Sequence, residues 1–196
     1  MIFDIVQAGD PVLRQPAQRI DPSHLGTSEF NELIESMVET MHAAPGVGLA
    51  APQVGLPIQL VVLEDRPETI ENLDPEARRL KARDVVPLTV LVNPTLEPVG
   101  DETVTFYEGC LSVSGWAAMT PRWLRVRVRA LNQMGDDVVL EWEGWPARIA
   151  QHEMDHLAGT LYIDRMDSRT FASAEYLAEV DDDEDEEDAE EDAEEL

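Results

Sequence analysis

The sequence predicts a compact domain that combines a few helices with several β-strands. Its 196 residues fit one domain with a short appendage. Hydrophobic residues make up 43% of the chain and are spread along it, so a sizeable core can form. Segments with helical periodicity and short segments rich in β-branched residues are interspersed along the same part of the chain, which indicates that helices and strands belong to one domain. We therefore expect a single domain over residues 1–180 and an appendage over residues 181–196.

The first predicted helix lies in "TSEFNELIESMVETMHAA". Thr27 or Ser28 can cap its first turn. Its apolar residues recur at the spacing of one helical face, so we expect them to pack into the core: Phe30, Leu33, Ile34, Met37, Val38 and Met41. His42 near its end and His24 in a preceding loop are interpreted as surface histidines.

Four segments have the β-branched content and alternation of strands: 58–63, 88–93, 123–131 and 137–142. The last two flank "NQMGDD", in which Gly135 suits a hairpin turn, and this predicts an antiparallel pair. Arg125, Arg127 and Arg129 would share one face of their strand. A solvated face is the favoured interpretation, and a docking patch is the alternative.

A polar segment at residues 64–87 separates two of these strands. We predict a long loop there, with one helical turn near Pro75 to Arg83, and it could lie beside the functional site. Its composition indicates no function.

The last clear helix lies in "GWPARIAQHEMDHLAGT", between Gly144 and Gly159. His152 and His156 would sit one turn apart on one face of it. A second helix is expected to start at Asp167 or Ser168 and to carry Phe171 and Leu177 inward.

The charge of the chain is strongly negative and uneven. The net charge is −27, and residues 181–196 hold 13 Asp or Glu and no Lys or Arg. We expect that tail to be disordered. An acidic surface argues against direct nucleic-acid binding. The sequence has no membrane-spanning segment and no secretion signal, and its single cysteine, Cys110, excludes an internal disulfide. These features predict a soluble protein that is not exported.

Two segments carry candidate chemistry. In "QHEMDHL", His152 and His156 can bind one metal ion while Glu153 reaches a water beside it; a plain surface or core helix is the alternative. Cys110 is the obvious third ligand, and Cys–His–His plus water is an open catalytic site. In "GVGLAAPQVG", the glycines let the backbone approach a ligand and direct the Gln53 amide at it. The alternative is a glycine-rich turn in the core.

Together, "GVGLAAPQVG", "EGCLS" and "QHEMDHL" resemble the three motifs of the peptide deformylases, in the same order. The likeness extends over about residues 9–171, and "GWPARIAQHEMDHLAGTLYIDRMDSRTF" is similar to the subgroup of mitochondria, plastids and some bacteria. This resemblance implies an α+β fold in which mixed and antiparallel β-sheets surround the HExxH helix. It also implies one divalent metal ion, Fe²⁺ or, in its place, Zn²⁺, Ni²⁺ or Co²⁺, held by Cys110, His152 and His156.

The resemblance further implies an activity: hydrolysis of the formyl group from N-formylmethionyl nascent peptides during protein maturation in the bacterial cytoplasm. Glu153 would be the general base, and the Gln53 amide with the Leu111 N–H would stabilise the developing negative oxygen. Gly48 and Gly109 would hold the substrate backbone, and Glu108 would pair with Arg122 behind the metal ligands. The methionine pocket would be walled by Val47, Phe106, Trp145 and Ile149.

Two other functions fit parts of the sequence. An HExxH metallopeptidase takes its third ligand downstream, whereas Cys110 lies upstream of the histidines. A catalytically idle, metal-stabilised binding protein would have no need of Glu153 and Gln53. Proximity to the ribosome is compatible with the deformylase interpretation, but not through the acidic tail, which ribosomal RNA would repel. The segment "SGWAAMTPR" after the cysteine leaves contacts beyond the first substrate residue in doubt.

Overall fold

Two β-sheets organise the fold of the computed structural model, which describes residues 1–44 and 46–180. The larger sheet has the strand order β1-β2-β3-β6-β7, and the smaller has the order β4-β5-β8. The strands are β1 (Gly48–Ala50), β2 (Leu60–Asp65), β3 (Val86–Pro98), β4 (Thr103–Cys110), β5 (Val113–Trp123), β6 (Arg125–Leu131), β7 (Asp137–Glu143) and β8 (Ala172–Ser173). The helices are α1 (Ser28–Ala43), α2 (Pro67–Glu71), α3 (Pro75–Leu80) and α4 (Trp145–Leu157), and residues 174–180 are also helical. Short 3-10 turns occupy Pro11–Arg14, Pro22–His24, Ala51–Val54, Tyr162–Asp164 and Ser168–Thr170.

The predicted α+β class is confirmed, but the sheets are antiparallel rather than mixed. Every strand pairing within the two sheets of the described residues is antiparallel. A parallel contact occurs as an isolated bridge between Gln18 and Ile58.

Strand β2 separates two hydrophobic clusters because successive side chains of a strand point to opposite faces. Leu60 and Val62 pack with α1, whereas Val61 and Leu63 pack with α4. All four residues are buried, which explains why this strand is apolar throughout. The larger sheet therefore lies between two helices, with α1 on one face and α4 on the other.

Helix α1 forms where the sequence predicts it. The Thr27 hydroxyl accepts a hydrogen bond from the Phe30 amide, so Thr27 rather than Ser28 is the N-cap. Phe30, Ile34 and Met37 are buried against the sheet. His42, in its last turn, is partly exposed and lies 2.6 Å from a carboxylate oxygen of Glu64.

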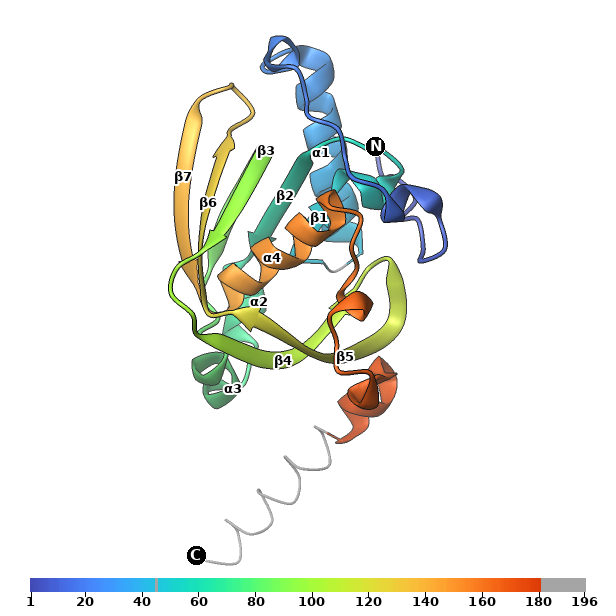
Figure 1. The fold of residues 1–196 in the computed structure, drawn as a ribbon, viewed down its shortest axis with the longest axis vertical. Helices are drawn as coiled ribbons and strands as arrows, with labels where there is room; N and C mark the ends of the chain where they lie inside the picture. Colours follow the sequence, from blue (N-terminus) through green and yellow to red (C-terminus); the bar gives the residue numbers. More distant parts are fainter. Residues whose placement is uncertain (45, 181–196) are drawn as a thin grey trace, which may run out of the picture.

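Helix α4 carries both histidines of the HExxH motif and contacts strands of both sheets. Figure 1 shows it lying across the larger sheet and next to the β4–β5 pair. Gly144 precedes it with φ 66°, and Gly159 follows it with φ 73°. A Cβ atom on Gly159 would come within 2.8 Å of the Gln15 backbone nitrogen, so this end of the helix requires glycine.

The predicted β6–β7 hairpin is confirmed, with Gly135 in its turn at φ 89°. Val126 and Val128 of β6 are fully buried. The opposite face of this strand is solvated, as favoured: Arg125 pairs with Glu143, and Arg127 pairs with Glu97 and Glu141. Neighbouring strands therefore supply carboxylates to this arginine face.

Two predictions about connecting segments need correction. Residues 64–87 are not one long loop, because α2 and α3 lie within the segment and its two ends belong to β2 and β3; the turn near Pro75 was predicted and α2 was not. The helix expected from Asp167 or Ser168 starts only at residue 174, after a 3-10 turn and β8. Phe171 does not point into the core: it is 39% exposed and stacks on Trp116. The predicted disorder of 181–196 lies outside the described residues.

Candidate metal centre

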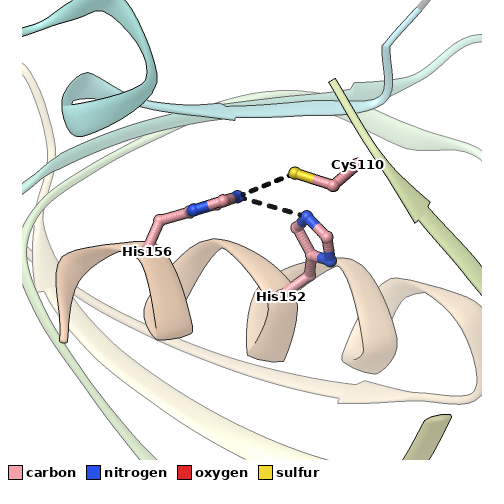
Figure 2. A group of neighbouring side chains, drawn as sticks. All are labelled: Cys110, His152 and His156. Carbon is pink, nitrogen blue, oxygen red and sulfur yellow. Dashed lines mark hydrogen bonds between the residues drawn. The ribbon is translucent and has the colours of Figure 1, made fainter. Parts of the chain in front are cut away.

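Two segments that are distant in sequence bring together three side chains that could hold a metal ion. Cys110 ends β4, and His152 and His156 project from α4. Their donor atoms all lie within 4.8 Å of one another. Figure 2 shows the three side chains pointing toward a common centre. The His156 Nε2 atom lies 3.4 Å from the Cys110 Sγ atom and 3.2 Å from the His152 Nε2 atom.

This donor set fits a divalent transition-metal ion. Around a tetrahedral ion with nitrogen ligands at about 2.1 Å and sulfur at about 2.3 Å, neighbouring ligand atoms lie roughly 3.4–3.6 Å apart. The observed separations of 3.2 and 3.4 Å are close to these values. One thiolate and two imidazoles leave the fourth position of such a site open, as catalytic sites require.

Glu108 fixes the orientation of the first histidine. Its carboxylate lies 2.6 Å from His152 Nδ1, which leaves Nε2 of that ring to face the other ligands. The same carboxylate accepts hydrogen bonds from Arg122 and Arg148, and all three charged groups are buried. Burial alone would raise the pKa of Glu108, but the bonds from His152 and Arg122 hold that pKa well below its usual range. Asp155 extends the network by pairing with Arg122 and Arg165.

Glu153 approaches the backbone of β1 closely. A Cβ atom on Gly48 would lie 2.3 Å from Glu153 Oε1, so glycine at this position makes room for the carboxylate. Glu153 is 4% exposed, and its Oε2 atom has no hydrogen-bond partner among the described residues. Burial raises the pKa of Glu153 to about 7. A carboxyl group with that pKa can both accept and return a proton near neutral pH.

Gln53 is held rigidly with its amide nitrogen toward the cluster. Its Oε1 atom accepts a hydrogen bond from the Ala50 amide at 2.9 Å. Its Nε2 atom donates to Ser112 Oγ at 3.3 Å and lies 3.7 Å from Cys110 Sγ. The side chain is 1% exposed. Leu111, next to the cysteine, lines the same cavity as Gln53.

A cavity of about 510 Å³ opens beside the cluster. Its walls include most of the residues predicted to contact substrate: Val47, Gly48, Gly109, Trp145 and Ile149. The residues after the cysteine also reach it, through Ser114, Gly115 and Trp116.

Phe106, predicted as a pocket wall, does not line this cavity. The guanidinium carbon of Arg148 lies 5.4 Å from the Phe106 ring centroid, and Arg148 lines the cavity in its place. Phe106 and Glu108 are two residues apart on β4 and so share a face. Because Arg148 bonds Glu108, its side chain also covers Phe106.

Arg148 is the residue that sequence reasoning missed. It is 2% exposed and donates hydrogen bonds to Glu108, to the Thr120 carbonyl and to the Val104 carbonyl. One signal could have found it: Arg148 precedes His152 by four residues, so the two side chains lie on the same face of α4.

Comparison with known proteins agrees with this geometry. The profile of the polypeptide deformylase family matches residues 2–172. The chain belongs to this family. The Cys–His–His cluster is therefore the candidate metal centre of a deformylase, and deformylases are metal-dependent hydrolases.

Deformylases from plants, bacteria and human mitochondria are similar to this chain. Peptide deformylase 1A of tomato chloroplasts is 47% identical over 89% of this chain and 63% of its own length. Peptide deformylase 1 of Streptomyces coelicolor is 48% identical over 90% of this chain and 78% of its own length. The human mitochondrial deformylase is 43% identical, covering 88% of this chain and 71% of its own length. These relatives agree with the predicted likeness to the mitochondrial and plastid subgroup.

Solved deformylase structures share the fold. The Acinetobacter baumannii enzyme bound to Met-Ala-Ser has a TM-score of 0.75 and 31% identity, and the match covers 85% of this chain and 99% of that one. The Thermotoga maritima enzyme has a TM-score of 0.70 and 34% identity, covering 85% of this chain and 98% of that one. Among residues 1–44 and 46–180, no helix is long and apolar enough to cross a membrane.

Proposed function

We propose that this deformylase-family chain hydrolyses the formyl group from N-formylmethionyl peptides, releasing formate and a free amino terminus. The observation that carries the proposal is the Cys110–His152–His156 cluster with the buried Glu153 beside it at the wall of one cavity. The family assignment supplies the reaction class.

The chemistry divides between a bound ion and the protein. Cys110, His152 and His156 would hold a divalent metal ion, which would supply Lewis-acid chemistry at the open position of the site. Glu153 accepts the proton of the attacking water and later delivers it to the leaving amine. The Gln53 amide and the Leu111 N–H donate hydrogen bonds to the carbonyl oxygen as it becomes negative, an effect worth about 3 kcal/mol for one donor.

The cavity walls suit a methionine side chain. Val47, Trp145 and Ile149 supply apolar surface beside His152. The backbones of Gly48 and Gly109 are proposed to hold the peptide on either side. Arg148, rather than Phe106, forms the wall next to Glu108, and its charge is neutralised by that carboxylate.

The proposed ion is Fe²⁺, with Zn²⁺, Ni²⁺ and Co²⁺ as ions that the same thiolate and imidazole donors accept. The proposed substrates are nascent peptides in the bacterial cytoplasm. Proximity to the ribosome is not proposed to involve the acidic residues 181–196.

The test is formate release from a formyl-Met tripeptide by anaerobically purified, metal-loaded protein. Replacing Glu153 with Gln should lower kcat by about 10²–10⁴-fold, because the general base is lost. Glu141→Gln, which changes an exposed carboxylate of β7, is the matched control and should keep wild-type kcat. Metal content is measured for each protein.

Two results would contradict the proposal. One is an absence of formate release by metal-loaded wild-type protein. The other is cleavage of an unformylated peptide in its place, which would favour the metallopeptidase alternative.

A further inference from the structure

The segment between β2 and β3, residues 66–85, lies against the N-terminal end of α4. We propose that this segment holds Trp145 in place as a wall of the substrate pocket, with Arg83 as the positioning residue. The segment thereby helps to determine which first side chain the enzyme accepts. This inference rests on the proposed deformylase function, because it assigns the Trp145 wall to the pocket for that side chain.

A buried ion pair anchors the segment to the larger sheet. Arg83 Nε lies 2.7 Å from Asp65 Oδ2, and Arg83 Nη2 lies 3.2 Å from Asp65 Oδ1. Two parallel bonds of this kind fix the plane of a guanidinium group. The Asp65 side chain, at the end of β2, is 0% exposed, and that of Arg83 is 14% exposed. The Arg83 guanidinium is therefore held in place by its two bonds to Asp65 at the end of β2.

The anchored guanidinium lies on the Trp145 ring. The Arg83 guanidinium carbon is 5.2 Å from the ring centroid, and Lys81 Nζ is 5.5 Å from it. Both are within the roughly 6 Å over which a cation attracts an aromatic face. Trp145 Nε1 is buried and has no hydrogen-bond partner among the described residues. Since the indole N–H makes no bond there to fix the ring, its orientation depends on packing against the core and on these cations, with Arg148 as a third at 5.8 Å from the centroid.

The backbone of the segment also meets the start of α4. The Trp145 amide donates to the Ala82 carbonyl at 3.4 Å, and no side chain caps this helix. A Cβ atom on Gly144 would lie 2.5 Å from Ala82 Cβ, so the two backbones approach as closely as glycine permits. Ala82 itself has φ 44°, a conformation that surrounding contacts must impose on alanine. The segment therefore caps the helix that carries Trp145, Ile149 and both histidines.

Loss of the Arg83 contacts should release the indole while leaving the reacting groups in place. Trp145 and Ile149 wall the cavity, whereas Glu153 and the two histidines of the cluster lie one to three turns further along α4, and Cys110 lies on β4. A mobile wall weakens binding of the first side chain without removing any group that acts on the formyl carbon. The signature is a change in KM and in side-chain preference, with kcat retained.

The experiment compares Arg83→Met with Arg79→Met in the full-length, metal-loaded enzyme. Arg79 lies on the same segment, but its side chain is 76% exposed and pairs with Glu76. Formate release is measured for tripeptides that begin with formyl-Met, formyl-norleucine or formyl-Phe. Arg83→Met should raise KM for formyl-Met about tenfold, keep kcat within about twofold, and reduce the preference for formyl-Met over formyl-Phe. Arg79→Met should match the wild type.

A double-mutant cycle with Trp145→Phe distinguishes positioning from general loosening of the fold. If Arg83 acts through the indole, Arg83→Met should change KM less than twofold in the Trp145→Phe background. An equal effect of Arg83→Met on KM in both backgrounds, or no effect in either, would overturn the inference. If the wild-type enzyme is active in the same assay, the proposed function still stands. An inactive wild type would overturn both.

Arg83→Lys provides the same cycle if Arg83→Met does not fold. Its ammonium group can still pair with Asp65 but cannot form the planar, two-bond contact. A threefold or larger rise in KM that disappears in the Trp145→Phe background is expected. Wild-type KM and side-chain preference in Arg83→Lys would then count against the proposal.

Discussion

At the scale of single residues, Glu108 lies at the centre of a buried cluster of charged side chains. Its buried carboxylate contacts His152, Arg122 and Arg148 together. Replacing Arg148 with Met should destabilise the protein by about 3 kcal/mol, because buried Glu108 loses one of its charged partners and the Thr120 and Val104 carbonyls each lose a donor. Urea denaturation of the metal-loaded protein measures this loss.

Arg125→Met is the matched control for that prediction. Arg125 pairs with Glu143 on β7, and both side chains are more than half exposed, at 54% and 56%. A pair in water contributes little, so this change should alter stability by no more than about 0.5 kcal/mol. An equal loss of stability in Arg148→Met and Arg125→Met would mean that burial does not determine how much each ion pair contributes to stability.

Sequence spacing and composition were sufficient to predict that Cys110, His152 and His156 come together, but not the packing around them. His152 and His156 could be paired from the sequence because helix periodicity alone brings residues i and i+4 together. Cys110 could be added because it is the sole cysteine of the chain. Phe106 was misplaced because its neighbour in space, Arg148, comes from a different element. No local pattern reveals that an arginine of α4 will cover a ring of β4.

At the scale of elements, helix α1 offers a direct test of its cap. Thr27→Ala should lower stability by about 1 kcal/mol, because the Phe30 amide loses its partner. Ser28→Ala, one residue inside the helix, should change stability much less, since alanine is the better helix former there. Thermal or urea unfolding of both variants decides this prediction, and a larger loss for Ser28→Ala would contradict the observed cap.

Elements with a clear period, or with a short run rich in β-branched residues, were predictable, and those with neither were not. Helix α1 and the β6–β7 hairpin show clean alternation or helical spacing, and both formed as expected. Strands β4 and β5 were missed, although they carry Cys110 and line the cavity. Strand β5 contains Gly115 and Pro121, and its buried positions from Ala118 onward include the polar residues Thr120 and Arg122, so the burial there gives no alternation of apolar and polar residues in the sequence.

At the scale of the whole molecule, the metal would connect β4 of the smaller sheet to α4. Removing it with a chelator should therefore lower Tm. At an ion concentration about 1,000 times Kd, bound metal adds about 4 kcal/mol, which corresponds to about 8–16 °C for a chain of this size. Scanning calorimetry before chelation, after it, and after restoring the ion measures the change.

The same calorimetric scans test whether residues 1–180 behave as one domain, which stays a prediction. A calorimetric enthalpy equal to the van't Hoff enthalpy is expected for a single cooperative unit.

A Tm that does not respond to the ion would contradict the role of the cluster in joining the sheet and the helix. Cys110→Ser, which removes one ligand, should show a smaller response to added ion than the wild type.

The separation of the ligands along the chain also sets an order of events during synthesis. Cys110 precedes His156 by 46 residues, so the thiol is synthesised well before its last partner exists. At about 5–20 residues per second, that interval lasts roughly 2–9 s. During that interval the set of three donors is incomplete, so the metal ion cannot yet be held by all of them. The metal centre is thus a late product of translation, because it cannot be complete before α4 has been made.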